Sequence, residues 1–258
     1  MKVTVLGFWA IEAFGETSSF LVEAGSQTIL VDASPGVCRQ LSSHSFRMTS
    51  LDAVLLSHVH GDHLLGFPYV VFSRAVQSRG LEKQPEPLVV IGNQATLDAA
   101  QTLLRVCYPD RSDFKVKWHV LSNGQSLRLH DLQIKSFEVE HTVPTLAYRI
   151  EQEQIVGYTA DTRPCDGIAA FFEGVDLLIL EAFGLRRDFE SIALSQKHLL
   201  ADEAGRLAVE VKAPRVLPFH MHLPYRDKGK MDQLMSEIRS QGYEGEIICP
   251  EEFLTVTV

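Results

Sequence analysis

The sequence has few cysteines, no long apolar run and no segment with the features of a targeting signal. Its four cysteines, at positions 38, 107, 165 and 249, form no CxxC pair, which argues against a disulfide framework and against a cysteine-based zinc site. No apolar run approaches the roughly 18–20 residues that a membrane-spanning helix needs, and Met1–Gly7 has the pattern of a short strand rather than of a signal peptide. We therefore expect a cytoplasmic protein that does not associate with membranes.

An excess of basic residues is also absent. The 24 Lys and Arg residues and the 33 Asp and Glu residues give a formal net charge of −9. This is the wrong sign for a protein that binds nucleic acid mainly by releasing counterions. We therefore expect no extended nucleic-acid interface, and any contact with a phosphate group is expected to be local.

The 258 residues contain no internal repeat and no low-complexity tract, and 45% of them are hydrophobic, which suits one large folded domain. Strand-like and helix-like stretches alternate in both halves, and neither half looks complete alone. We predict a single domain over residues 1–258, of the α/β (α+β) class, with two stacked sheets and helices outside. The only stretch that resembles a linker is Gln77–Pro87, which we interpret as a loop.

Apolar periodicity and turn residues indicate the secondary structure. Strands are expected at residues 2–7, 18–23, 28–32, 53–57, 88–91, 115–121, 132–140, 145–151, 154–159, 176–180, 215–218, 246–248 and 253–258. Helices are expected at residues 66–77, 93–106, 163–172, 198–211 and 229–240, with a further helix opening at Pro35.

Three of the ten histidines lie within six residues, directly after the apolar strand predicted at 53–57. His58 and His60 are two residues apart, a spacing that in an extended segment places both imidazoles on one side, within reach of one metal ion. Asp62 and His63 begin the next turn and are expected to point in another direction, so they suit a second metal position. Gly61 supplies the backbone freedom that this reversal of the chain requires. The alternative interpretation is a chance polar loop at a strand end.

The segment His58–His63 (HVHGDH) matches the HxHxDH signature and so resembles the metallo-β-lactamase superfamily of dinuclear metal hydrolases. The start of the chain is similar to that of members that resemble ribonuclease Z. The resemblance implies the metallo-β-lactamase fold, a four-layer αββα sandwich, over nearly the whole chain. It also implies that Asp32 orients the ligand loop through hydrogen bonds. Ala33 and Ser34 differ from the cysteine or threonine and the glycine of many relatives, so the loop after Asp32 is expected to differ in detail.

The other motifs of the superfamily follow in order. His141 resembles the third motif and Asp161 the fourth, an aspartate that bridges both ions. Taken without the resemblance, His141 would be a structural histidine and Asp161 the N-cap of the helix predicted at 163–172. For the fifth motif we choose His220 over His222, although the His-x-His spacing leaves either imidazole able to reach a metal. The resemblance thus implies these metal ligands: His58, His60 and His141 on one ion, Asp62, His63 and His220 on the other, with Asp161 between them.

His198 opens the helix predicted at 198–211 and resembles a histidine of the phosphodiesterase branch that precedes an alanine-rich helix and contacts the scissile phosphate. An alkoxide leaving group needs an acid whose pKa is near the working pH, and imidazole meets this need. We therefore predict that His198, together with Asp62 and Asp161, takes part in catalysis and that Glu181 holds His198 in orientation. The alternative is a solvent-facing histidine at a helix start.

The predicted function is that of a dinuclear metal-dependent hydrolase, in particular a phosphodiesterase that attacks a small or terminal phosphodiester with a metal-bridging hydroxide. Two divalent ions are expected, with Zn²⁺ favoured by the nitrogen-rich ligand set and Mn²⁺ or Fe as alternatives. Only twenty positions separate His141 from Asp161, so the tRNA-gripping arm that the resemblance places there is absent, and a small-molecule or short substrate is expected. Rival functions are lactone, thioester or β-lactam hydrolysis, or a non-catalytic metal-binding module. A homodimer is expected because dimers are common among similar proteins.

Overall fold

The structure, a computed structural model, describes residues 1–10, 17–111, 113–189 and 197–258. Contacts within the chain divide it into two compact units. Unit 1 comprises Met1–Gly7, Phe14–Leu121 and Glu252–Thr257, and unit 2 comprises Phe8–Ala13, Ser122–Glu251 and Val258. Unit 1 therefore takes strands from both ends of the chain. That residues 1–258 form one domain stays a prediction.

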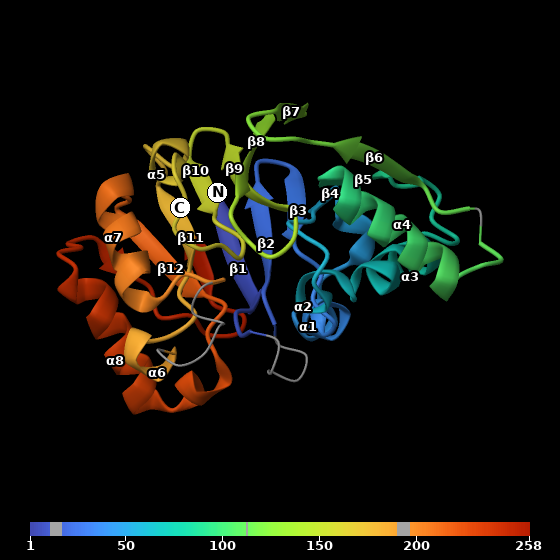
Figure 1. The fold of residues 1–258 in the computed structure, drawn as a ribbon. Coiled ribbons are helices and arrows are strands. Elements are labelled where there is room, and N and C mark those ends of the chain that lie inside the picture. Colours follow the sequence, from blue (N-terminus) through green and yellow to red (C-terminus); the bar gives the residue numbers. More distant parts are fainter. Residues whose placement is uncertain (11–16, 112, 190–196) are drawn as a thin grey trace. The chain divides into compact units, whose positions relative to one another are not determined.

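Unit 1 contains a mixed seven-stranded sheet with the order β14-β1-β2-β3-β4-β5-β6 (Figure 1). Strands β1 to β3 pair antiparallel, and β3 to β6 pair parallel. The strands are β1 (Lys2–Gly7), β2 (Ser19–Ala24), β3 (Gln27–Val31), β4 (Ala53–Leu55), β5 (Leu88–Gly92), β6 (Val116–Val120) and β14 (Thr255–Thr257).

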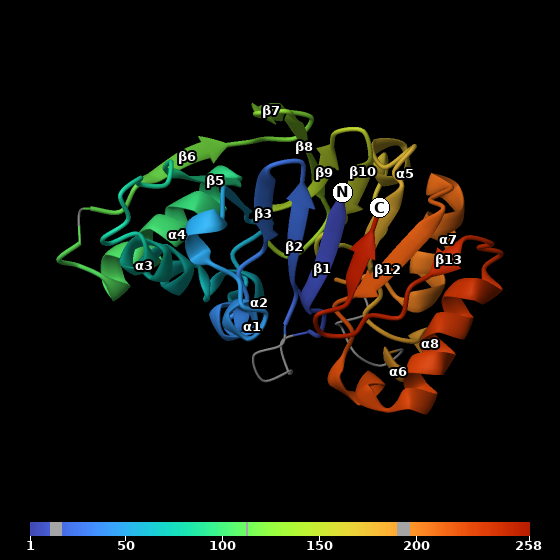
Figure 2. The same ribbon diagram turned by 180° about the vertical axis from the view of Figure 1, so that it is seen from behind.

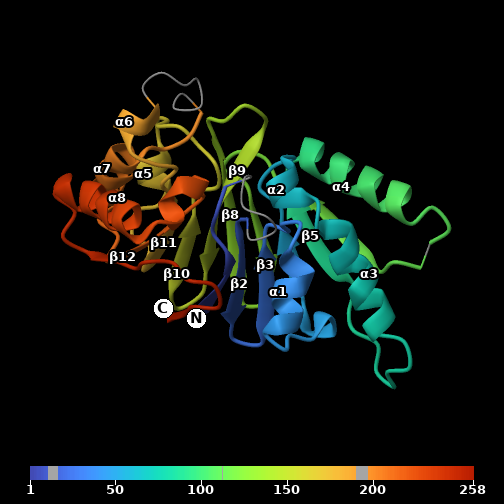
Figure 3. The same ribbon diagram turned by 90° about the horizontal axis from the view of Figure 1, so that it is seen from below.

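The helices of unit 1 pack on one face of this sheet. Leu30, Val54 and Val90 lie side by side on β3, β4 and β5 and share one buried apolar cluster with residues of these helices. Viewed from below, α1 and α3 lie next to each other (Figure 3). The helices are α1 (Val37–Ser43), α2 (Gly61–Leu64), α3 (Phe67–Gln77) and α4 (Gln94–Cys107), with a 3-10 turn at Met48–Ser50.

Unit 2 contains a second mixed seven-stranded sheet, with the order β13-β12-β11-β10-β9-β8-β7. Strands β7 to β10 pair antiparallel and β10 to β13 pair parallel. The strands are β7 (Ser126–Leu129), β8 (Leu132–Val139), β9 (Thr145–Glu151), β10 (Ile155–Tyr158), β11 (Leu177–Glu181), β12 (Arg215–Phe219) and β13 (Glu246–Ile247).

Helices α7 and α8 of unit 2 lie side by side along its parallel strands (Figure 2). The helices are α5 (Ile168–Phe171), α6 (Arg186–Phe189), α7 (Ala201–Val211) and α8 (Lys228–Ser240), with a 3-10 turn at Leu223–Arg226. No helix in the described part of the chain combines the length and the apolar character that crossing a bilayer requires.

Two local expectations were wrong, and one strand was missed. The helix predicted from residue 163 begins only at Ile168, because Pro164 disfavours helical backbone at Arg163 and Gly167 has a left-handed backbone with φ of 85°. The helix predicted from His198 begins at Ala201, where the Glu203 carboxylate accepts a hydrogen bond from the Leu200 N–H. Strand β7 was not predicted, since its four residues alternate polar and apolar side chains over too short a run.

Candidate metal centre

In unit 1 the parallel pairing of β3 and β4 places Asp32 beside the histidine loop. The Asp32 N–H donates to the Leu55 carbonyl at 2.8 Å, one step beyond the paired strands. Asp32 therefore lies at the carboxyl ends of these strands, where the chain leaves β4 and enters the segment Ser57–His63. The loop is anchored further on, where the Thr17 hydroxyl donates to the Asp62 carbonyl at 2.8 Å.

The buried Asp32 carboxylate fixes the protonation pattern of two histidines. It accepts hydrogen bonds from the Ser57 N–H and the Ser57 hydroxyl, both at 2.7 Å, and from His63 Nδ1 at 2.8 Å. Because the Ser57 hydroxyl donates to Asp32, it accepts from His58 Nδ1 at 2.9 Å. In neutral imidazole one ring nitrogen carries the proton and the other a lone pair, so Nε2 of both His58 and His63 is left with a lone pair for a metal.

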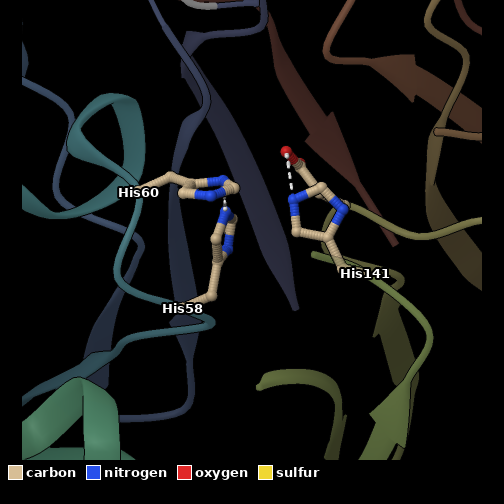
Figure 4. A group of neighbouring side chains, drawn as sticks. His58, His60 and His141 are labelled. Atoms are coloured by element: carbon tan, nitrogen blue, oxygen red, sulfur yellow. Dashed lines mark hydrogen bonds and ion pairs between the residues drawn. The ribbon is translucent and has the colours of Figure 1, made fainter. Parts of the chain in front are cut away.

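The first two histidines of the motif present nitrogens to the same point. His58 Nε2 and His60 Nδ1 lie 3.1 Å apart, and Figure 4 shows the two rings meeting edge to face. Two nitrogens on a tetrahedral ion with Zn–N bonds of about 2.0–2.1 Å are separated by about 3.3 Å. The observed separation therefore suits two ligands of one ion, as the spacing of these histidines predicted.

Asp62 and His63 form the second part of the loop, on the short helix α2. The His63 ring and the Asp62 carboxylate are buried, and His63 Nε2 lies 3.6 Å from Asp62 Oδ2. Since Nδ1 of His63 donates to Asp32, it is the Nε2 side that faces this carboxylate. The pair thus offers one nitrogen and one oxygen donor in addition to the two nitrogens of His58 and His60, and the His58 and His63 ring centroids lie 4.3 Å from each other.

In unit 2 the carboxyl ends of β10, β11 and β12 bring Asp161, Glu181 and His220 together. His220 Nδ1 donates to Glu181 Oε1 at 3.0 Å, which directs its Nε2 to Asp161 Oδ2 at 3.2 Å. All three side chains are buried. His220 has a left-handed backbone with φ of 59°, and Ala160 before Asp161 has φ of 53°. Such conformations are unfavourable for residues other than glycine and gather at functional sites.

His198 is held against the same carboxylate. Its Nδ1 lies 2.6 Å from Glu181 Oε1, and its ring stacks on Phe183 with a centroid distance of 4.5 Å. Burial alone would raise the pKa of Glu181, but the neighbouring His198 and the hydrogen bonds from His198 and His220 lower it overall. Glu181 is therefore an ionised carboxylate at neutral pH, and His198 keeps its proton on Nδ1.

His141, which follows β8, is oriented by the backbone. Its Nδ1 donates to the Lys197 carbonyl at 3.0 Å, and its Nε2 lies 4.0 Å from Asp161 Oδ2. Burial lowers the pKa of His141, although Asp161 and Glu181 oppose this shift. A lowered pKa favours the neutral ring, which is the form that binds metals.

These donor sets fit divalent ions. Within unit 2, Asp161, Glu181, His198 and His220 offer ligand atoms that all lie within 4.8 Å of one another. Unit 1 contributes three histidines and a carboxylate with the lone pairs described above. Buried imidazole and carboxylate donors of this kind are consistent with a dinuclear metal site. They do not identify the metal.

The predicted site residues thus gather in two groups. Unit 1 brings together His58, His60, Asp62 and His63, and unit 2 brings together His141, Asp161, His198 and His220; that the two groups share ions stays a prediction. Asp161 is not a helix N-cap, because α5 begins after Gly167.

The structure places His220 and His222, the two candidates for the fifth motif, in different surroundings. The His222 ring contacts Phe183 and Phe189, at centroid distances of 5.5 and 5.3 Å, whereas His220 faces Asp161. Sequence reasoning gave no role to Ser57 or to the Lys197 carbonyl. The position of Ser57 between the buried strand and the first histidine was a usable signal, but no sequence pattern marks a backbone carbonyl.

Comparisons with known proteins agree with this geometry. Residues 27–221 match the family model described as "Beta-lactamase superfamily domain". The chain is 32% identical to "Probable metallo-hydrolase YhfI" of Bacillus subtilis, over 96% of each chain. It is 25% identical to "Ribonuclease Z" of Thermococcus kodakarensis, over 90% of this chain and 86% of the relative.

Solved structures show the same fold. The crystal structure of YhfI from Bacillus subtilis matches with a TM-score of 0.81 and 28% identity, over 99% of this chain and 98% of that one. Human tRNase Z, short form, matches with a TM-score of 0.78 and 19% identity, over 100% of this chain and 99% of that one. The predicted metallo-β-lactamase fold is therefore confirmed. With the family model covering most of its length and buried histidine and aspartate clusters at the motif positions, this chain belongs to the metallo-β-lactamase superfamily of metal-dependent hydrolases.

Proposed function

We propose that the chain is a dinuclear metal-dependent phosphodiesterase that hydrolyses a small or terminal phosphodiester. Membership of the superfamily and the order of the motifs support combining the ligand groups of both units. One ion would be held by His58, His60 and His141, the other by Asp62, His63 and His220, with Asp161 shared. Asp32 would keep the ring proton of His63 on Nδ1 directly and that of His58 through the Ser57 hydroxyl. Glu181 would do the same for His220, so that the Nε2 lone pairs of these three rings face the ions.

Bound divalent ions, Zn²⁺ foremost with Mn²⁺ or Fe as alternatives, would supply a hydroxide nucleophile near neutral pH and stabilise charge on the phosphate oxygens. The protein's own residues have distinct tasks. The carboxylates of Asp62 and Asp161 would orient the attacking oxygen and accept its hydrogen bond. His198, with Nδ1 fixed by Glu181, would present Nε2 to the leaving oxygen.

The contact between His198 and Glu181 is the observation that carries the choice of a phosphodiester. It is short, at 2.6 Å, and His198 keeps 8% of its surface exposed, so the ring is rigidly held yet reachable. Because Nδ1 is engaged by Glu181, Nε2 is the ring nitrogen left to serve as a proton donor toward the substrate. An alkoxide leaving group needs such a donor, whereas a good leaving group such as p-nitrophenolate does not.

The segment between His141 and Asp161 supports the proposal of a small substrate. Strands β9 and β10 form a hairpin there and account for most of this segment. In ribonuclease Z, which this chain resembles, a tRNA-gripping arm is expected at this position. The hairpin occupies the corresponding segment here and leaves no room for such an arm. Together with the net charge of −9, the hairpin supports a small substrate over an extended nucleic acid. A homodimer stays a prediction, which size-exclusion chromatography with light scattering tests.

The substrate class is tested with purified protein loaded with Zn²⁺ or Mn²⁺. We expect hydrolysis of bis(p-nitrophenyl) phosphate and of a cyclic nucleotide, abolished by a chelator and restored by the metal. A lactone, a thioester and nitrocefin serve as carbonyl substrates. Hydrolysis confined to the carbonyl substrates would overturn the proposal, and metal binding without any turnover would favour a non-catalytic module.

The acid role is tested with His198→Ala, and His130→Ala, a change at an exposed histidine, is the control. We expect His198→Ala to retain both metals and to lose rate chiefly on diesters with poor leaving groups. His60→Ala is expected to lower the metal content instead. Equal losses on good and poor leaving groups would contradict the acid role of His198.

A further inference from the structure

A buried arginine without an acidic partner lies in unit 1, outside the residues assigned to the metal centre. Arg74, in the last turn of α3, is only 7% exposed. Its Nε donates to the Leu51 carbonyl at 3.1 Å and its Nη2 to the Glu86 carbonyl at 2.7 Å. These bonds use two of the five N–H groups of the guanidinium.

The charge of Arg74 is not balanced by a contact. In the described parts of the chain, no carboxylate oxygen lies within 4.0 Å of a guanidinium nitrogen of Arg74, which is the distance limit for an ion pair. Burial lowers the pKa of Arg74, and Asp52 opposes this shift only from a distance. A guanidinium stays protonated in proteins regardless, so the fold retains a desolvated positive charge, which is costly unless an anion approaches it.

Arg74 lines a cavity of ≈ 240 Å³ in the same unit. One wall is the loop after α3, within the stretch 77–87 that the sequence marked as linker-like. This loop is braced by Gln84, whose Nε2 donates to the carbonyls of Ser78 and Leu81 at 3.0 and 3.2 Å. The loop is therefore folded against itself beside the cavity, and its Glu86 carbonyl fixes the guanidinium.

The rest of the lining is basic and apolar. Arg79 and Lys115 are exposed residues of the lining, and Val71, Leu88 and Phe114 supply apolar surface. The one acidic side chain of the lining, Asp113, is engaged by Arg111 through Nε–Oδ1 and Nη2–Oδ2 contacts. Neither Arg79 nor Lys115 has an ion-pair partner among the described residues. Three cations thus surround the cavity of a protein whose net charge is −9.

We propose that this cavity, which we call the Arg74 pocket, is a binding site for a small organic anion with one phosphate or carboxylate group and an apolar part. The buried guanidinium of Arg74 binds the anionic group inside the cavity, and the exposed side chains of Arg79 and Lys115 bind it at the opening. Water occupies about 30 Å³ per molecule, so the pocket holds a ligand of about eight to ten non-hydrogen atoms. A nucleotide or a chain of nucleic acid is too large.

Binding is measured by isothermal titration calorimetry on metal-loaded protein. Phenylphosphonate is the phosphate-like probe and benzoate the carboxylate probe, and benzyl alcohol is an uncharged control of similar size. The test variant is the double substitution Arg79→Gln and Lys115→Gln, which changes exposed residues and leaves the buried Arg74 in place. The matched control is Lys83→Gln and Arg105→Gln, with the same charge change outside the lining.

We expect wild type and the control to bind an anionic probe equally within about twofold, and the test variant to bind it at least about tenfold more weakly. Benzyl alcohol is expected not to bind, and the tighter of the two anionic probes identifies the head group. Equal binding by wild type and test variant, no binding of either anion, or equal binding of benzyl alcohol would each overturn the proposal.

Two further measurements distinguish binding of phenylphosphonate in the Arg74 pocket from its binding at the metal centre. Its inhibition of bis(p-nitrophenyl) phosphate hydrolysis is expected to be the same in wild type and in the test variant. A crystal soaked with phenylphosphonate is expected to show the phosphonate within hydrogen-bond distance of Arg74. Density at the metal centre alone would contradict the proposal, and because binding is read directly, the outcome does not depend on the catalytic activity.

Discussion

Replacing Glu181 with glutamine tests the arrangement of unit 2, because four hydrogen bonds converge on this carboxylate. Oε1 accepts from His198 Nδ1 and His220 Nδ1, at 2.6 and 3.0 Å. Oε2 accepts from the backbone N–H groups of Thr162 and Leu199, at 2.7 and 3.2 Å. A glutamine has one oxygen and one NH₂ group. In one orientation of the amide the two backbone N–H groups face another donor, and in the other His198 and His220 must move their protons from Nδ1 to Nε2 to avoid this.

The size of the effect follows from these contacts. A buried donor left without an acceptor costs about 1–3 kcal/mol, so two cost about 2–6 kcal/mol. Removing a fully buried charge offsets part of this loss. We expect Glu181→Gln to lower the free energy of unfolding by about 2–4 kcal/mol, which for a chain of this size corresponds to a melting temperature lower by about 5–15 °C.

The rate is expected to fall as well. Losing a group that orients metal ligands or their neighbours lowers affinity or activity about 10–100-fold. The assays are thermal unfolding, metal content by mass spectrometry and hydrolysis of bis(p-nitrophenyl) phosphate, with Glu210→Gln as a control at an exposed position. If Glu181→Gln melted within about 2 °C of wild type and retained full activity, the proposed role of this carboxylate would be refuted.

Three further predictions concern other parts of the chain. Asp32→Ala is expected to weaken metal binding about 10–100-fold, because His58 and His63 lose the group that fixes their protons; titration of the apoprotein with Zn²⁺ checks this. Burial would raise the pKa of Asp202, but hydrogen bonds from two arginines lower it overall, so its contribution to stability is present above its unfolded-state pKa and is lost as the pH falls below about 4. Asp202→Asn is therefore expected to reduce the loss of melting temperature between pH 7 and pH 3.5, and an unchanged loss would contradict this. Gly205→Ala places a Cβ 2.6 Å from a backbone oxygen of α8 and is expected to destabilise the protein by about 1–3 kcal/mol in urea unfolding.

The fold was largely predictable because its long elements have clear apolar patterns. The apolar run Leu177–Leu180 indicated a strand, and all five residues of β11 (Leu177–Glu181) are buried. Errors occurred where local patterns are short or where tertiary contacts decide. His198 was expected in a helix, but His198 and the Leu199 N–H contact Glu181 instead, and the helix begins only at Ala201.

The metal ligands of the candidate site were easier to predict than the groups that orient them. The histidines and aspartates of the motif are recognisable from their type and spacing, so the sequence indicates the ligands. The groups that orient them are harder to find, because a hydroxyl such as that of Ser57 or a carbonyl such as that of Lys197 has no distinctive pattern. Glu181 was predicted only as the group that orients His198. Its place at the end of an apolar run was a further signal, because a buried acidic side chain is costly without partners.

The most direct test is a crystal structure of the metal-loaded protein with data collected at the absorption edge of the bound metal. The account predicts two anomalous peaks, with Asp161 in contact with both. One peak is expected beside the nitrogens of His58 and His60, the other beside those of His63 and His220. A single peak, or two peaks that do not include Asp161 as a shared ligand, would contradict the dinuclear centre on which the proposed reaction depends.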